Sequence, residues 1–314
     1  DLWFSKYDMP AEKFLEETDR VWEEVKPLYE ALHCHVRSKL NDEYGDEVVS
    51  LNGPLPVHIL GNMWGQSWSN IYDLVYTEPK ENKSINVTEI IKDRELTEIQ
   101  MVEYAEDFFL SIGFEPLPKT FWERSLFVKP LDREVQCHAS AWNLDSANND
   151  LRIKMCIEKN EEDFITIHHE LGHIFYYQAY NHLPTLFQGG ANDGFHEAFG
   201  DLLTLSITPD YLKNIGFITS EEAESAKEDA IGLLMKQALE GVVVIPWALM
   251  LDKWRSGIFN GDIDESNLNK SWWDMRESYQ GITSPVARSE DYFDPGAKYH
   301  IPANTPYTLS LIHI

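Results

Sequence analysis

Apolar residues recur at helical spacing along the first part of the chain. Between residues 12 and 43 they return at every third, fourth or seventh position, at Phe14, Val21, Val25, Leu28, Leu32, Val36 and Leu40. A helix with this spacing presents one apolar face. A second run of this kind covers 101–112 and ends at Gly113, before Pro116 and Pro118, and these residue types stop helices. The sequence therefore predicts one long and one shorter amphipathic helix.

The middle of the chain changes to a strand pattern and then returns to helices. Residues 134–142 and 151–157 have strand character, and the turn-rich stretch 145–150 joins them. Further helices are expected near 161–180, 194–207, 221–240, 242–258 and 264–280, with Pro246 as a kink or a break. We expect a mainly α fold with one small β-sheet.

Size and charge narrow the range of partners. A chain of 314 residues that is 43% hydrophobic can bury a substantial core, as one large domain or two. Its 53 acidic and 26 basic residues give a net charge of −27, which argues against nucleic acid or an anionic membrane as a partner. The acidic residues form either solvated helix faces or a field that favours cationic peptides. No membrane segment is expected, because the sequence contains no apolar run of the length needed to cross a bilayer.

Cysteines and glycosylation sequons bear on the cellular compartment. Cys137 and Cys156 flank the expected hairpin and can form a bridge, which leaves Cys34 over. Sequons of the form Asn-x-Ser/Thr begin at Asn82, Asn86 and Asn269. Together these features favour the secretory route and a secreted or extracellular protein. The start of the chain has neither an initiator Met nor a signal-peptide pattern, so we expect it to be internal or processed.

The strongest chemical signal lies in the expected helix 161–180. Residues 168–173 read His-His-Glu-Leu-Gly-His, which contains the pattern His-Glu-x-x-His. On a helix, His169 and His173 are one turn apart and point the same way. They can therefore hold one zinc ion, while Glu170 projects beside it to activate a water. Two His and a third ligand, Glu197, would leave a fourth position open, which is typical of a catalytic zinc site. Asp201, one turn after Glu197, is spaced to accept the outer N–H of a zinc histidine.

Several blocks of sequence together resemble the angiotensin-converting enzyme family, the zinc peptidyl-dipeptidases. The blocks are 60–64, 137–142, 168–173, 194–198 and 294–298. The resemblance runs from Asp1 to about Tyr307 and implies a large helical zinc-peptidase domain of the gluzincin type, with its small sheet near the metal. It also implies release of C-terminal dipeptides from oligopeptides, with zinc as cofactor and chloride as activator.

The resemblance assigns the zinc centre residue by residue. His169, His173 and Glu197 match the ligands, Glu170 matches the general base, and Asp201 matches the carboxylate that orients His169. The neighbouring histidines His168 and His196 are expected to face other ways on their helices, and neither is chosen as a ligand.

Substrate-binding residues also follow from the resemblance. His138 and His300 match a pair that hydrogen-bonds the substrate carbonyl beyond the scissile bond, and Ala139 lies on the strand that aligns the peptide. Gln66, Lys298 and Tyr307 match a clamp on the terminal carboxylate of the substrate. Gln66 favours dipeptide release, because the single-residue carboxypeptidase branch of the family carries Arg there. The expected substrates are peptides with a free C-terminal carboxylate.

The remaining matches concern chloride and the disulfide. Tyr7, Trp272 and Arg276 match chloride-site positions, and Cys137–Cys156 resembles a family disulfide. The chain begins and ends inside the family's domain, so we expect 1–308 to be the central portion of a single peptidyl-dipeptidase domain. After Thr308 the resemblance stops, with Leu309 and Ser310 in place of a chloride-site Arg and an oxyanion-stabilising Tyr. We interpret 309–314 as a non-native tail and expect this fragment to be crippled as an enzyme.

Other interpretations compete with this one. Without the family context, His138 reads as a strand histidine with no ligand role, and Lys298 as an ordinary surface lysine. The functional alternatives are another zinc oligopeptidase that cuts internal bonds, a single-residue carboxypeptidase, and an inactive peptide-binding fragment.

Overall fold

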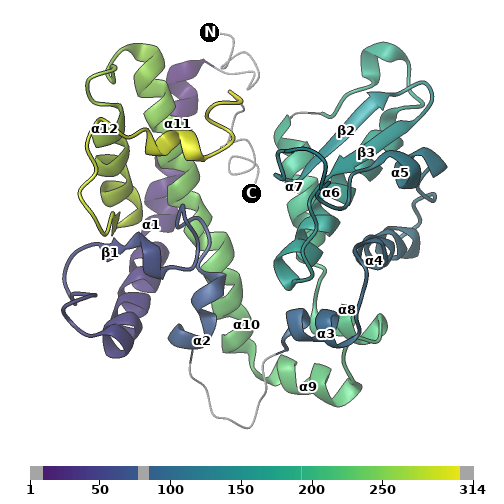
Figure 1. Cartoon of the computed structure of the whole chain (residues 1–314), viewed down its shortest axis with the longest axis horizontal. Helices are drawn as coiled ribbons and strands as arrows, with labels where there is room; N and C mark the ends of the chain where they lie inside the picture. The colour runs from purple at the N-terminus through teal and green to yellow at the C-terminus, as the bar shows by residue number, and fades with distance from the viewer. Residues whose placement is uncertain (1–9, 77–84, 192, 305–314) are drawn as a thin grey trace. The chain divides into compact units, whose positions relative to one another are not determined.

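The computed structural model describes residues 10–76, 85–191 and 193–304. The chain forms two compact units (Figure 1). The first unit combines Asp1–Asn82 with Asp229–Ile312, and the second consists of Lys83–Glu228 together with the last two residues. Each unit has its own buried core, so each is described by itself. The expectation of a mainly α protein is confirmed.

Two long helices dominate the first unit. α1 (Ala11–Tyr44) contacts α11 (Val243–Asn260), and the two lie side by side in Figure 1. α1 confirms the predicted long helix, since it buries Phe14, Leu32, Val36 and Leu40. The other elements of this unit are β1 (Leu55–Pro56), the 3-10 turns Val57–Ile59, Ser69–Ile71 and Asp294–Ala297, α2 (Tyr72–Val75), α10 (Ala230–Gln237), α12 (Leu268–Met275), the π turns Ala238–Val242 and Arg276–Gln280, and β4 (Ile282–Thr283).

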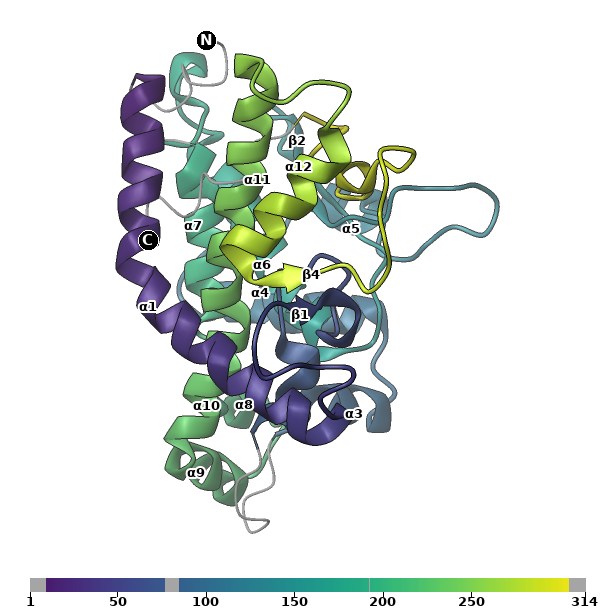
Figure 2. The ribbon, with the colours of Figure 1, turned by 90° about the vertical axis from the view of Figure 1, so that its left-hand side faces the viewer.

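A minimal parallel sheet joins distant parts of the first unit. β1 pairs with β4 in the register Leu55↔Ile282 and Pro56↔Thr283 (Figure 2). Leu55 and Ile282 are both fully buried. This pairing fixes the loop after α1 to the end of the C-terminal helical segment.

One helical stretch of the first unit has membrane-like length and composition. Ile231–Asn260 is long and apolar enough to cross a bilayer by those two criteria, which the sequence reading did not anticipate. Its side chains Trp247, Met250, Leu251 and Trp254 are nevertheless buried in a core that also contains Trp272. Packing within the unit therefore accounts for these four positions, whereas Ile231, Leu234 and Phe259 of the same stretch are exposed.

The predicted helix 221–240 is in fact two helices. α9 (Ser220–Glu228) ends before Asp229, and α10 begins after it. The side chain of Asp229 accepts a hydrogen bond from the backbone N–H of Gly232 at 3.0 Å and caps the new helix. Pro246 does not break α11; a π turn, Ala238–Val242, lies just before that helix.

The second unit is organised around α6 (Glu161–Tyr180). Its remaining elements are α3 (Val87–Asp93), α4 (Glu98–Ser111), α5 (Lys119–Arg124), β2 (Ser140–Asp145), β3 (Asp150–Lys154), a 3-10 turn at Thr185–Phe187, α7 (Asp193–Thr204), α8 (Pro209–Asn214) and α9 (Ser220–Glu228). Asn160 caps α6 by accepting from the N–H of Asp163 at 2.7 Å. Acidic residues fill the first turn, where they suit the helix dipole. Phe175 stacks on Phe109 of α4 with ring centroids 4.2 Å apart, which anchors α6 in the core.

The predicted hairpin exists, but its first strand was placed too early. β2 and β3 are antiparallel, from Ser140↔Lys154 to Asp145↔Asp150. β3 spans only 150–154, so the residues before 140 have no strand of the hairpin opposite them. The part of the prediction covering 134–139 is therefore wrong. Cys137 and Cys156 form the expected disulfide, which ties the segment before β2 to the segment after β3.

Candidate metal centre

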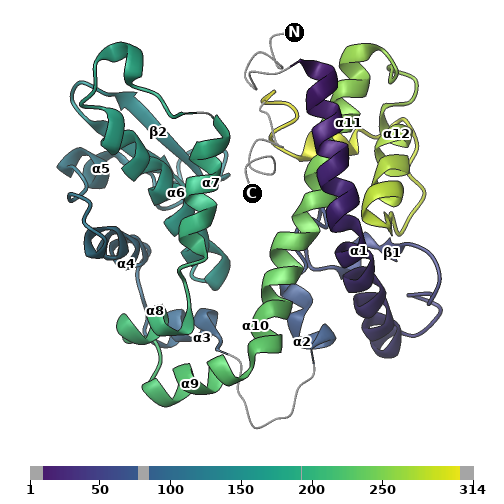
Figure 3. The ribbon, with the colours of Figure 1, turned by 180° about the vertical axis from the view of Figure 1, so that it is seen from behind.

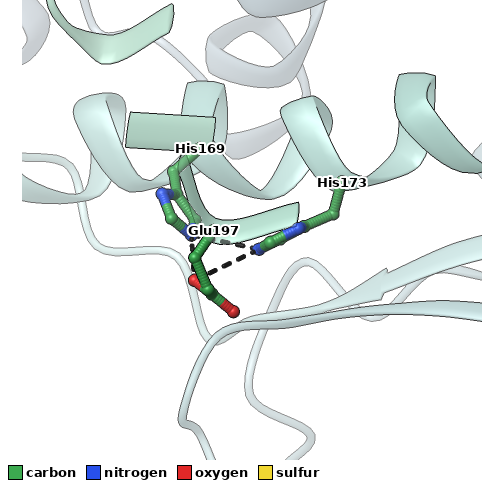
Figure 4. Close-up of side chains that lie close together, drawn as sticks. All are labelled: His169, His173 and Glu197. Carbon is green, nitrogen blue, oxygen red and sulfur yellow. Dashed lines mark hydrogen bonds and ion pairs between the residues drawn. The ribbon is translucent and has the colours of Figure 1, made fainter. Parts of the chain in front are cut away.

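Three potential ligands converge from two helices of the second unit. His169 and His173 come from α6 and Glu197 from α7 (Figure 4). The two Nε2 atoms are 3.1 Å apart, and the Oε2 atom of Glu197 lies 3.2 Å from Nε2 of His169 and 3.7 Å from Nε2 of His173. The structure therefore brings together the three residues that the sequence singled out as zinc ligands.

Two glycines let the helices approach closely enough for this. α6 and α7 run against each other (Figure 3). A Cβ atom on Gly172 would lie 2.9 Å from Cα of Gly200, and one on Gly200 would lie 2.8 Å from Nδ1 of His169. Either contact is too short for a real side chain. The sequence analysis assigned no role to these two glycines. The only feature of the sequence that could have indicated one is their position close to His173 and Glu197.

The outer nitrogen of His169 is held by a carboxylate. Its Nδ1 lies 2.9 Å from Oδ1 of Asp201, one turn after Glu197. Burial acts to lower the pKa of His169, but Asp201 and Glu197 outweigh it and raise that pKa well above its usual value. For Glu197 burial acts to raise the pKa, and hydrogen bonds with the two histidines hold it far below its usual range instead. The surroundings therefore favour an ionised Glu197 next to a positively charged His169.

Glu170 lies buried beside this group. Its Oε2 atom is enclosed and has no hydrogen-bond partner among the described residues. Burial raises the pKa of this carboxyl above its usual value. A buried carboxylate without a partner is costly unless a ligand compensates it. Two imidazole nitrogens and a carboxylate form a donor set that suits Zn²⁺, so the residues present fit this ion.

His196 was missed by the sequence analysis. It was expected to face away from the ligands, but its Nδ1 lies 3.3 Å from Nδ1 of His173. Its Nε2 lies 2.9 Å from the hydroxyl of Tyr180. Its position next to Glu197 on α7 was the available signal. His168 does face another way: it is fully buried, and Nδ1 bonds the carbonyl of Phe164 at 2.8 Å.

The second unit also carries two of the predicted substrate residues. His138 is exposed, just before β2, and its backbone N–H donates to Oε1 of Gln136 at 2.7 Å. Ala139 is half-buried against the core of this unit.

The predicted carboxylate clamp belongs to the first unit. Lys298 is buried, and its Nζ donates to Oε1 of Gln66 at 2.7 Å. The ammonium lies 4.7 Å from the centre of the Trp64 ring, a cation–π distance. Burial lowers the pKa of Lys298 to about 8. His300 is half-buried two residues further on. Tyr307, the third clamp residue, lies outside the described residues.

A second buried cation lies near the predicted chloride positions. Arg276 donates through Nε to Oε1 of Gln280 at 3.2 Å and through Nη2 to the carbonyl of Trp64. Its guanidinium lies over the rings of Trp247 and Trp273, 5.5 and 4.8 Å from their centres. Burial lowers its pKa, although a guanidinium stays charged at neutral pH. Trp272 is buried in the core, and Tyr7 lies outside the described residues.

The sequons differ in accessibility. Asn86 is exposed at the start of α3, and Asn82 lies outside the described residues. Asn269 is completely buried, and its Nδ2 donates to the carbonyl of Ser289 at 3.1 Å and to Asp294 at 3.2 Å. The expectation of a glycan at Asn269 is therefore wrong for the folded chain, because no sugar fits on an enclosed amide.

Known proteins are similar to this chain in sequence. The family described as angiotensin-converting enzyme, Peptidase_M2, matches residues 1–314. Angiotensin-converting enzyme of Bos taurus is 47% identical over 310 residues, which is 98% of this chain and 23% of that protein. The enzymes of Haematobia irritans exigua and Theromyzon tessulatum are each 41% identical, over 99% and 98% of this chain and 50% and 49% of theirs. The chain thus spans half or less of the length of these relatives.

Proposed function

The chain belongs to the angiotensin-converting enzyme family, and from that membership we propose that it is part of a zinc metallopeptidase that releases dipeptides from the C-terminal end of oligopeptides. The observation that carries the proposal is the convergence of His169, His173 and Glu197 beside the buried carboxyl of Glu170. The names of the relatives support the reaction class.

In this proposal the second unit performs the hydrolysis. His169, His173 and Glu197 hold Zn²⁺, which when bound polarises the scissile carbonyl and makes water more acidic. Glu170 takes a proton from the attacking water and returns it to the leaving amine. Its raised pKa suits both halves of that task, because a general acid–base works best with a pKa near the working pH. Asp201 keeps Nδ1 of His169 protonated, so that Nε2 is free to bind the metal.

The proposal also takes the peptide-binding residues from membership of the family. His138 and His300 donate to the substrate carbonyl beyond the scissile bond, and Ala139 aligns the peptide backbone. Lys298 and Gln66, with Tyr307, hold the terminal carboxylate. The hydrogen bond from Lys298 to Gln66 supports this role, because it holds two of the three clamp residues together.

Chloride activation and secretion complete the proposal. The proposal assigns chloride binding to the buried guanidinium of Arg276, which lies over aromatic rings and also interacts with the carboxylate of Asp294; Trp272 and Tyr7 would complete the chloride sites. The Cys137–Cys156 disulfide supports an oxidising, extracellular location. Two further statements stay predictions: that residues 1–308 belong to one domain, and that residues 309–314 are a non-native tail.

The test compares two versions of one peptide. An N-terminally blocked oligopeptide with a free C-terminus, and its C-terminal amide, are incubated with the zinc-loaded protein, and the products are identified by mass spectrometry. We expect chelator-sensitive release of the C-terminal dipeptide from the free acid only. Cleavage of internal bonds in both peptides would favour an oligopeptidase, and release of one residue a carboxypeptidase.

A further inference from the structure

The second ligand histidine has a support that differs from that of the first. We infer that His196, held in turn by Tyr180, is a positioning residue that orients His173 for the metal; this inference rests on the proposed zinc site. Nδ1 of His173 lies 3.3 Å from Nδ1 of His196, and Nε2 of His196 lies 2.9 Å from the Tyr180 hydroxyl. The three side chains form one hydrogen-bonded row that begins at the ligand.

Metal binding fixes the protons along this row. Nε2 of His173 faces Nε2 of His169 and the carboxylate of Glu197, so it is the nitrogen that binds the metal and carries no proton. Its Nδ1 then carries the proton and donates to Nδ1 of His196. His196 must therefore be protonated at Nε2, which donates to the hydroxyl oxygen of Tyr180. One ligand atom thus determines a single tautomer for both histidines.

Packing holds the ring of His196 in place. The ring centres of Tyr176 and Tyr177 lie 4.4 and 4.7 Å from it, and Tyr180 is buried. All three tyrosines belong to the last part of α6, while His196 belongs to α7. The contact that orients His173 is therefore built between the same two helices that supply the ligands.

The two ligand histidines consequently have unlike partners. Asp201 gives His169 a charged acceptor, whereas His196 gives His173 a neutral one. A neutral acceptor orients the ring and adds no negative charge to a centre that already contains Glu197 and Glu170. Such outer partners of metal ligands typically contribute about 10–100-fold to metal affinity.

Zinc affinity tests the inference directly. The dissociation constant of zinc is measured by competition with a chromogenic chelator for the unmodified protein and for His196→Phe, His196→Asn and Tyr180→Phe. His196→Phe keeps an aromatic ring but no acceptor, and we expect zinc to bind about 10–100-fold more weakly. His196→Asn keeps an acceptor oxygen near the position of Nδ1 and should recover part of the loss. Tyr180→Phe should weaken zinc binding less than His196→Phe.

Two controls separate positioning from a general loss of structure. His182→Phe changes an exposed histidine of the same unit and should leave zinc affinity unchanged. Thermal unfolding of the metal-free variants reports folding, and the visible spectrum of the cobalt-loaded proteins reports ligand geometry. A changed cobalt spectrum in His196→Phe, with unfolding of the metal-free form unchanged, supports positioning.

The outcomes are distinct. Zinc affinity of His196→Phe equal to that of His182→Phe would overturn the inference and leave the proposed function standing. An unmodified protein that binds no zinc would overturn both. If His196→Phe does not fold, His196→Asn and Tyr180→Phe decide: affinities equal to that of the unmodified protein in both would count against positioning.

Discussion

In the second unit, imidazoles and carboxylates from two helices converge on one point, whereas the first unit buries two cations, Lys298 and Arg276, among aromatic rings and neutral acceptors. The first arrangement suits a metal cation. The second places an ammonium against a neutral amide and a guanidinium over aromatic rings, with the carboxylate of Asp294 also acting on Arg276. The two units thus gather groups of different charge, imidazoles and carboxylates in one and buried cations in the other.

The units also reach their arrangements differently. The metal centre uses neighbouring turns of α6 and α7, so short-range helical spacing places most of its atoms. Lys298 and Gln66 are far apart in sequence and meet through loop packing. Substitutions in the candidate metal centre should therefore affect chemistry, and those at Lys298 and Gln66 should affect recognition.

The largest expected effect is on turnover. Glu170→Gln keeps the size of the side chain but removes its ability to accept a proton, so peptide hydrolysis should fall by about 10²–10⁴-fold. Zinc affinity should stay close to that of the unmodified protein. Glu197→Gln is the matched control, because it keeps the base and weakens the ligand; it should lose zinc. Full activity of Glu170→Gln would refute the assignment of the base.

A smaller effect is expected on recognition. Lys298→Met removes the ammonium but keeps the length of the side chain, so the preference for a free acid over a C-terminal amide should fall by about 10–100-fold, as for one charged hydrogen bond. Zinc affinity should not change. Lys270→Met, at an exposed lysine of the same unit, should leave the preference intact. A preference that survives in Lys298→Met would remove this residue from the clamp.

The pH dependence of the first unit sharpens the comparison. Because the pKa of Lys298 is about 8, its ammonium disappears above pH 8, and KM for free-acid peptides should rise about tenfold per pH unit there. Stability should respond in the opposite direction. The folded pKa lies below the unfolded value of 10.5, so between pH 8 and 10.5 the unfolded chain binds more protons and this group's contribution to stability rises with pH. Between pH 8 and 10.5, the free energy of unfolding measured in urea should lack this rise with pH in Lys298→Met.

The smallest expected effect concerns the loop that carries Lys298. Asp294 accepts from Nε of Arg288 at 2.9 Å and from the indole of Trp273 at 2.8 Å. Asp294→Asn should lower the free energy of unfolding by about 1–2 kcal/mol, measured in urea, while the exposed Asp291→Asn should change it little. Hydrogen bonding by Arg288 lowers the pKa of Asp294, so the difference should shrink as acid protonates this carboxylate. A difference that persists in strong acid would contradict this origin.

Patterns within a short stretch of sequence predicted the features that depend on short-range interactions. The apolar spacing predicted α1 nearly to its ends, the expected helix 161–180 coincides with α6, and the one-turn spacing of His169 and His173 correctly placed their two imidazoles side by side. Tertiary context decided the rest. Residues 134–139 have strand-like composition but no strand opposite them, and Asp229 ends a helical pattern because its side chain caps the next helix.

The misjudged residues share one cause. The sequon at Asn269 does not reveal that its side-chain amide is buried and donates hydrogen bonds to Ser289 and Asp294. The orientation of His196 depends on how α7 packs against three tyrosines of α6. Burial and cross-helix contacts are properties of the folded chain, so periodicity within one element does not reveal them.

The close approach of α6 and α7 has a consequence for mutational tolerance. Gly172 and Gly200 carry no functional group, yet any side chain at either position would collide with the facing helix or with the ring of His169. In a library of random variants, the active members should therefore carry only glycine at these two positions. Catalytic residues would show the same intolerance to substitution. Loss of function on substitution would then mark a position where two helices must approach closely. A chemical probe of reactive groups would not detect such a position.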